Sequence, residues 1–150
     1  GLACLGESVQ MCKRIGGEAK VEAELERSHI EMGNLYLENS RKGTQCFLDK
    51  AEEHYKSSMA LCVKWKDDPL FAPTALLRAS FNIGLALNMK QRISDSVKYF
   101  EKTISEHERL KRLLKRVSTE QFNCLSLEIR SSEMICARAA AYIANEAKGE

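Results

Sequence analysis

The residues of this chain most able to do chemistry are its histidines and cysteines. The three histidines, His29, His54 and His107, stand far apart in the sequence, and no Cys/His pair has the spacing of a zinc site. A Gly-rich phosphate loop, G-x-S-x-G and H-E-x-x-H are all missing from the sequence. We therefore expect no enzyme activity, no metal and no cofactor, and we interpret His29 as a packing residue. We expect the six cysteines to be reduced and mostly to act as small buried hydrophobes: Cys4, Cys12, Cys46, Cys62, Cys124 and Cys136.

A second set of residues is suited to binding rather than to reaction. Amide side chains can hydrogen-bond an extended peptide backbone, and carboxylates attract basic side chains. The candidate peptide-binding residues are Arg27, Glu31, Asn34, Glu38, Arg78, Phe81, Asn82, Leu85 and Met89, with Ile30, Leu37 and Asn88 at neighbouring positions of the same surface. They can act together only if two helices present them side by side.

The composition favours such helices. The chain has 150 residues, 44% of them hydrophobic, a net charge of +2, eight glycines and two prolines. Helix-favouring residues dominate, and no apolar run reaches membrane-spanning length. We expect an all-α, soluble, intracellular protein in a reducing compartment. Because the chain begins at Gly1 rather than Met, we also expect it to be a fragment of a longer protein.

The clearest pattern lies between Ala75 and Thr103. Apolar and small residues recur at helical spacing on both sides of a break at residues 88–91, which predicts two helices joined by a short turn. A small residue, Gly84, stands in the first helix and an aromatic residue, Phe100, in the second. This arrangement is typical of a tetratricopeptide repeat, in which the small residue allows close crossing and the aromatic ring fills the wedge.

The same pattern recurs earlier in the chain. With Gly33 aligned on Gly84, Ala51 takes the place of Ser96, Tyr55 that of Phe100, and Ser58 that of Thr103. Ala51 follows Gly33 by 18 residues and Ser96 follows Gly84 by 12, so six extra residues enter the loop of the first repeat. We therefore expect the two repeats to fold alike.

These features predict a tetratricopeptide-repeat superhelix of about six long helices with an atypical C-terminal helix. As one domain over 1–150, it would contain a partial repeat at 1–16, a repeat at 18–66 with a loop insertion at 40–48, a repeat at 72–117 and a terminal helix at 118–147. The first repeat is expected to contain helices from about Glu18 to Asn39 and from Leu48 to about Lys66. Ser118 to Gln121 forms a capping box that would start the terminal helix, either as the first helix of another repeat or as an end helix.

One helix face is strongly basic. Its residues are Arg109, Lys111, Arg112, Lys115 and Arg116. Such a face can contact nucleic acid or an acidic partner, but solvation is the more usual role of a surface of this kind. We do not expect direct nucleic-acid binding.

Three segments indicate a family. MGNLYLEN, DKAEEHYKSSMALCVKWKDDP and ASFNIGLALN resemble the tetratricopeptide domain of Tonsoku (Tonsoku-like) proteins. The shared features are the insertion between Gly33 and Ala51, the run that ends before Pro69, and Asn82-Ile83-Gly84. The likeness spans about Met11 to Phe100, and residues 105–150 depart from it.

The resemblance implies a nuclear scaffold at replication forks, acting in homologous recombination and chromatin maintenance. In that family the repeats are implicated in reading the tail of newly deposited replicative histone three. Among the candidate peptide-binding residues only Asn82 matches a family motif; the others follow from the expected geometry. Two alternatives stay open: a protein–protein adaptor of the polarity type that binds a linear motif, and a structural scaffold packed against its own parent chain.

Overall fold

The computed structural model describes residues 18–40, 45–68 and 71–149. It contains five helices: α2 (Ala19–Asn39), α3 (Gln45–Lys64), α4 (Ala75–Met89), α5 (Ile93–Leu114) and α6 (Thr119–Gly149). No strand occurs in these ranges, which confirms the prediction of an all-helical chain. The expected helix of the partial repeat at 1–16 lies outside the described residues. None of the described helices is long and apolar enough to cross a membrane.

The helix limits differ from the prediction at one loop. The prediction started the second helix at Leu48, but α3 starts at Gln45, so the loop between the first two helices is shorter than 40–48. Phe47 accounts for the extra turn, because its ring lies 5.7 Å from the ring of Tyr36 on α2. The terminal helix runs unbroken over 31 residues, and the backbone N–H of Gln121 donates to Ser118 Oγ at 3.4 Å, as expected for the capping box.

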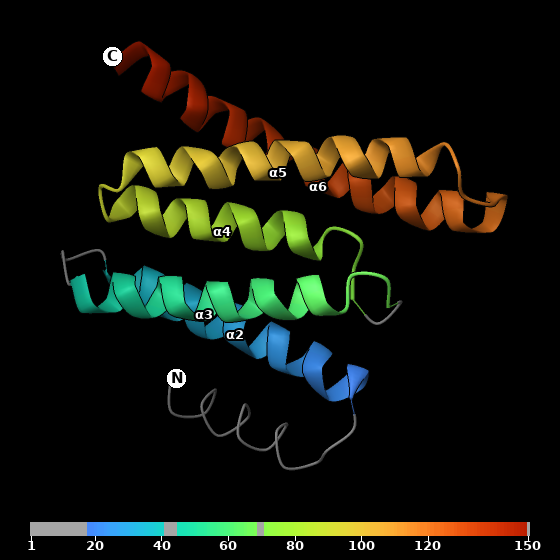
Figure 1. Cartoon of the computed structure of the whole chain (residues 1–150), viewed down its shortest axis with the longest axis horizontal. Coiled ribbons are helices and arrows are strands. Elements are labelled where there is room, and N and C mark those ends of the chain that lie inside the picture. The colour runs from blue at the N-terminus through green and yellow to red at the C-terminus, as the bar shows by residue number, and fades with distance from the viewer. Residues whose placement is uncertain (1–17, 41–44, 69–70, 150) are drawn as a thin grey trace.

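The helices stack in chain order, with the hairpin α2–α3 below the hairpin α4–α5 and α6 against α5 (Figure 1). Within each hairpin a glycine lies on an aromatic ring. A Cβ atom added to Gly33 would lie 2.6 Å from Tyr55, and one added to Gly84 would lie 2.6 Å from Phe100. These identical contacts confirm that Gly33 pairs with Tyr55 as Gly84 pairs with Phe100.

The small residues predicted at the helix contacts are also buried. Ala51 and Ser96, and likewise Ser58 and Thr103, have no exposed surface. The two members of each pair occupy corresponding places, one in each hairpin. The two hairpins therefore share one packing scheme. The longer connection of the first hairpin leaves this scheme unchanged.

Helix α6 packs on α5 as α4 packs on α3. Ala79 and Ala86 of α4 belong to the clusters around Cys62 and Tyr55 of α3. Ala79 and Ala86 are seven residues apart, and so are Ser132 and Ala139 of α6. Ser132 forms a hydrogen bond with His107 of α5, and Ala139 packs with Phe100 of α5. Helix α6 therefore takes the place of the first helix of a further hairpin, and Ala137 stands where Gly84 stands in α4.

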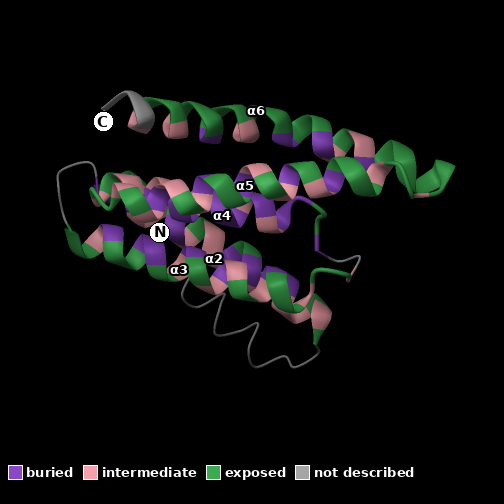
Figure 2. Cartoon of the chain, turned by 45° about the horizontal axis from the view of Figure 1, so that its top comes forward, coloured by how far each residue is buried: buried purple, intermediate pink, exposed green. Residues whose placement is uncertain are grey.

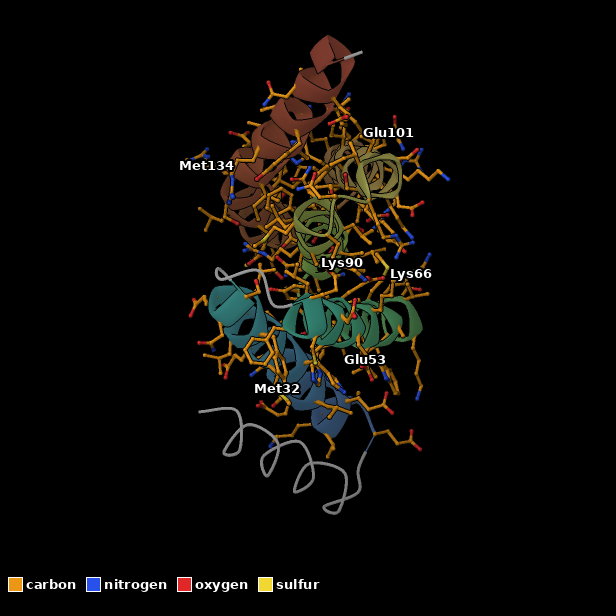
Figure 3. The ribbon with its side chains drawn as sticks, turned by 90° about the vertical axis from the view of Figure 1, so that its left-hand side faces the viewer. Met32, Glu53, Lys66, Lys90, Glu101 and Met134 are labelled. Atoms are coloured by element: carbon orange, nitrogen blue, oxygen red, sulfur yellow. The ribbon has the colours of Figure 1, made fainter. Side chains whose placement is uncertain are left out.

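The outer face of α6 is largely exposed (Figure 2). Leu127 and Met134 are 65% and 72% exposed, and Met134 projects away from the other helices (Figure 3). The buried residues instead line the faces that the helices turn toward one another (Figure 2).

A charged network joins the two hairpins. Lys90 lies at the junction of α3 and α4 (Figure 3), and its Nζ is 2.7 Å from Glu52 and 2.6 Å from Asp49. The hydrogen bonds that Lys90 donates to these two carboxylates raise its pKa, so the amine stays charged. The next residue, Gln91, has a φ of 64°, an uncommon backbone conformation that the tight turn requires.

A buried carboxyl group joins α2 to α3. Glu26 is 6% exposed, and its Oε1 accepts hydrogen bonds from Ser58 Oγ at 2.9 Å and Cys62 Sγ at 3.5 Å. Burial raises the pKa of Glu26 above its ordinary 4.5, although these two hydrogen bonds lower it in part. Burial also raises the pKa of the Cys62 thiol, which therefore stays protonated and able to donate.

This shift predicts a pH dependence of stability. A carboxyl whose pKa is higher in the folded state stabilises the fold below its unfolded pKa, and that stabilisation is lost as pH rises through the folded pKa. Relative to Glu26→Gln, which cannot titrate, the wild type should lose stability as pH rises from about 4.5 toward neutrality. Urea unfolding of both proteins across this range tests the prediction. Parallel stability curves would show that Glu26 ionises as freely in the folded chain as in the unfolded one.

Candidate functional site

A cavity of about 280 Å³ opens between α2, α4 and α6, and we call it the groove. Helices from both hairpins and from the C-terminal element contribute to its lining. The lining residues are Ile30 and Asn34 from α2; Arg78, Phe81, Asn82 and Leu85 from α4; and Ile135 and Arg138 from α6.

The groove brings together part of the predicted set. The predicted residues that line it are Asn34, Arg78, Phe81, Asn82 and Leu85. Four others lie outside the lining: Arg27, Glu31 and Glu38 are exposed on α2, and Met89 is 40% exposed at the end of α4. By helical rotation, Glu31 and Glu38 fall within about 60° of Asn34 around the helix axis, so they lie on the same side of α2.

The two amides of the groove differ in what they contact. The Tyr55 hydroxyl donates to Asn34 Oδ1 at 2.5 Å, and burial raises the pKa of Tyr55, so this donor keeps its proton. Asn82 is half-buried, and its amide makes no side-chain hydrogen bond to any described residue. One amide is therefore oriented by the fold while the other is available to a ligand.

Phe81 forms part of the floor rather than an open contact surface. Its ring is 4% exposed and lies 5.6 Å from the ring of Phe100. The guanidinium of Arg138 stands 5.0 Å from the centroid of the Phe81 ring, a cation–π distance. Phe81 thus supports the groove by holding Arg138 in place.

Arg78 is held by hydroxyl groups. Its Nε donates to Thr74 Oγ1 and its Nη2 donates to Ser131 Oγ, both at 3.3 Å. Thr74 in turn donates to Glu128 Oε2 at 2.9 Å. In contrast, Arg27 outside the lining pairs with Glu24 at 2.9 Å.

Sequence reasoning missed the contribution of α6. Ile135 and Arg138 complete the groove, although the predicted set contained residues of α2 and α4 alone. The available signal was the apolar stripe of residues 119–147, which includes Ile135 and predicts a face packed on another helix. Arg138 stands three residues later and so falls near the edge of that stripe.

A second, larger cavity of about 810 Å³ lies where α5 ends and α6 begins. Its walls include buried Phe71, Leu110 and Leu125, together with more exposed Leu113 and half-buried Val117. The same lining carries both acidic and basic side chains, among them Asp67, Glu120, Lys66 and Arg109. It therefore has no single charge by which to select a ligand.

The three histidines lie on separate helices, as the sequence predicts, but two of them meet across the first hairpin. His29 of α2 and His54 of α3 meet with their Nδ1 atoms 3.0 Å apart, and Tyr36 stacks on His54. Burial lowers the pKa of His54. His107 is buried beside Ser132, and the described residues contain no group of three His, Cys, Asp or Glu side chains that could hold a metal ion.

The prediction that most cysteines are buried is wrong for two of the four that the structure describes. Cys62 is buried and Cys136 is half-buried, but Cys46 and Cys124 are exposed, and all four are free thiols. Cys46 is exposed because α3 starts earlier than predicted and places this residue on an outward-facing first turn. Cys4 and Cys12 lie outside the described residues.

The basic face is partly neutralised by its own helix. Arg109 contacts Glu106 at 3.0 Å, and Lys111 lies 3.4 Å from Glu108. Arg112, Lys115 and Arg116 are exposed. The i,i+3 pairs of Arg109 with Glu106 and of Lys111 with Glu108 are those expected on a solvated helix surface.

Comparison with protein-family models, curated proteins and solved structures finds no match to this chain.

Proposed function

We propose that this chain is a non-catalytic scaffold that binds an extended peptide in the groove. The observation that carries the proposal is the half-buried Asn82 amide, which lacks a side-chain partner among the described residues while facing the same cavity as Asn34. An extended peptide has unpaired backbone N–H and C=O groups, and an amide side chain can both donate to and accept from them. Ile30, Leu85 and Ile135 supply apolar surface for the side chains of that peptide.

The resemblance to Tonsoku-type repeats suggests one ligand, the unmodified tail of replicative histone three. Exposed Glu31 and Glu38 favour this candidate, because they lie on the same side of α2 as Asn34 and could face lysine or arginine side chains. The chain would then be a nuclear chromatin reader in replication-fork repair by homologous recombination. Arg78 and Arg138 oppose a wholly basic ligand within the groove itself.

The alternatives predict other behaviour. A polarity-type adaptor would bind a partner's linear motif in the same groove, so it would share the Asn82 requirement but not the preference for a basic tail. A structural scaffold packed against its own parent chain would bind no added peptide until that parent segment is removed.

Asn82→Ala is the variant that tests the proposal. We expect it to weaken binding of an unmodified histone-three tail peptide by about 1–3 kcal/mol, because a desolvated peptide group loses its partner.

Charge reversal at Glu31 and Glu38 should slow association, and a rise from low to physiological salt should weaken binding because these charges are exposed. Titration calorimetry and stopped-flow fluorescence measure the two effects.

Arg112→Glu with Arg116→Glu is the matched control, since it changes exposed charges on the basic face and leaves the groove intact. Binding that disappears in this control but survives Asn82→Ala would place the site on α5. Binding of a non-basic motif that requires Asn82 would instead favour the adaptor.

A further inference from the structure

Two guanidinium groups line the groove without a carboxylate partner. Arg78 and Arg138 form no ion pair with any described residue, and the groove lining contains no aspartate or glutamate. Arg27, Arg92 and Arg109 each lie within 3.0 Å of a carboxylate oxygen, whereas the exposed Arg112, Arg116 and Arg130 form no ion pair with a described residue either. Arg78 and Arg138 differ from those three in that they line one cavity together. The groove therefore concentrates positive charge that the described fold leaves uncompensated.

Neutral contacts hold both guanidiniums in place. Arg78 donates to the hydroxyls of Thr74 and Ser131, while Arg138 stands over the ring of Phe81. The nearest carboxylate in this network, Glu128, bonds Thr74 rather than the guanidinium. Side chains that are already oriented lose less conformational entropy when they bind a ligand.

We infer that the groove binds a carboxylate of its peptide ligand between Arg78 and Arg138. A guanidinium matches the planar shape of a carboxylate and can donate to both of its oxygens. Asn82 would then hold the adjoining peptide group, so this inference rests on the proposed function. The carboxylate could come from the C-terminus of a chain or from an Asp or Glu side chain.

Four short peptides separate these sources. They are N-acetyl-Ala-Ala-Ala with a free C-terminus, its C-terminal amide, and two further amides in which Glu or Lys replaces the central Ala. Titrated into the ¹⁵N-labelled protein, they report weak binding through the side-chain N–H signals of arginine and asparagine. We expect at least one carboxylate peptide to bind about tenfold more tightly than the neutral amide, and the Lys peptide to bind least.

The variants Arg78→Gln and Arg138→Gln should remove this preference, so that the carboxylate peptides bind no more tightly than the neutral amide. The control Arg112→Gln with Arg116→Gln removes two charges from the exposed basic face and should retain the preference. Equal affinity for all four peptides, with Asn82 still required, would overturn the carboxylate site but not the peptide groove. Absence of binding by all four at millimolar concentration would overturn both. Because the wild-type comparison needs no variant, the inference stays testable even if a substitution impairs folding.

Discussion

Phe100→Ala should lower the free energy of unfolding by about 3–5 kcal/mol, the cost usual for removing a buried aromatic ring. The ring of Phe100 has no exposed surface and joins three helices. It covers Gly84 of α4, lies 5.6 Å from Phe81, and stacks on Tyr142 of α6 at 4.7 Å. Its removal would leave a cavity that no neighbouring side chain fills, and chemical denaturation followed by far-UV circular dichroism measures the loss.

Phe122→Ala is the matched control, because it deletes the same ring from a site that is 44% exposed on α6. We expect that change to cost less than about 1 kcal/mol, since a partly solvated ring leaves no closed cavity. Similar losses in the two variants would mean that Phe100 does not organise the contact between α4, α5 and α6.

The hairpins could be predicted from sequence because the main contact in each is a glycine packed against an aromatic ring. Gly33 with Tyr55, and Gly84 with Phe100, recur with small residues at fixed intervals, and sequence spacing alone shows such a recurrence. The start of α3 could not be predicted in this way. It depends on Phe47 meeting Tyr36 across the hairpin, a tertiary contact that local periodicity does not contain.

The candidate site was predictable only in part for a related reason. Asn34 and Asn82 share the groove because equivalent helices of two similar hairpins present equivalent faces. Arg138 reaches the groove because α6 packs on α5 as α4 packs on α3, and the sequence left the role of that helix open. The sequence also could not show that Arg78 and Arg138 lack carboxylate partners. Their lack of a partner depends on which side chains of three separate helices line the same cavity.

Gly84→Leu should destabilise the chain by about 2–3 kcal/mol. A Cβ at this position would lie 2.6 Å from Cε1 and 2.8 Å from Cδ1 of Phe100, and both distances are too short for unstrained contact. The ring cannot move aside, because Phe81 and Tyr142 pack on it. Overpacking of this kind costs about 1–3 kcal/mol, and we expect the cost at Gly84 to lie at the upper end of that range. The better helix propensity of leucine offsets about 1 kcal/mol of this cost at most.

Ala137→Leu provides the matched control on α6. Ala137 follows Ser132 by five residues, as Gly84 follows Ala79, but it is exposed rather than covered by a ring. We expect its free energy of unfolding to change by no more than about 0.5 kcal/mol. If Gly84→Leu left the denaturation midpoint unchanged, the conclusion that α4 and α5 cross closely at Phe100 would be wrong. If both variants lost stability equally, helix α6 would make a contact at Ala137 equivalent to the one that α4 makes at Gly84.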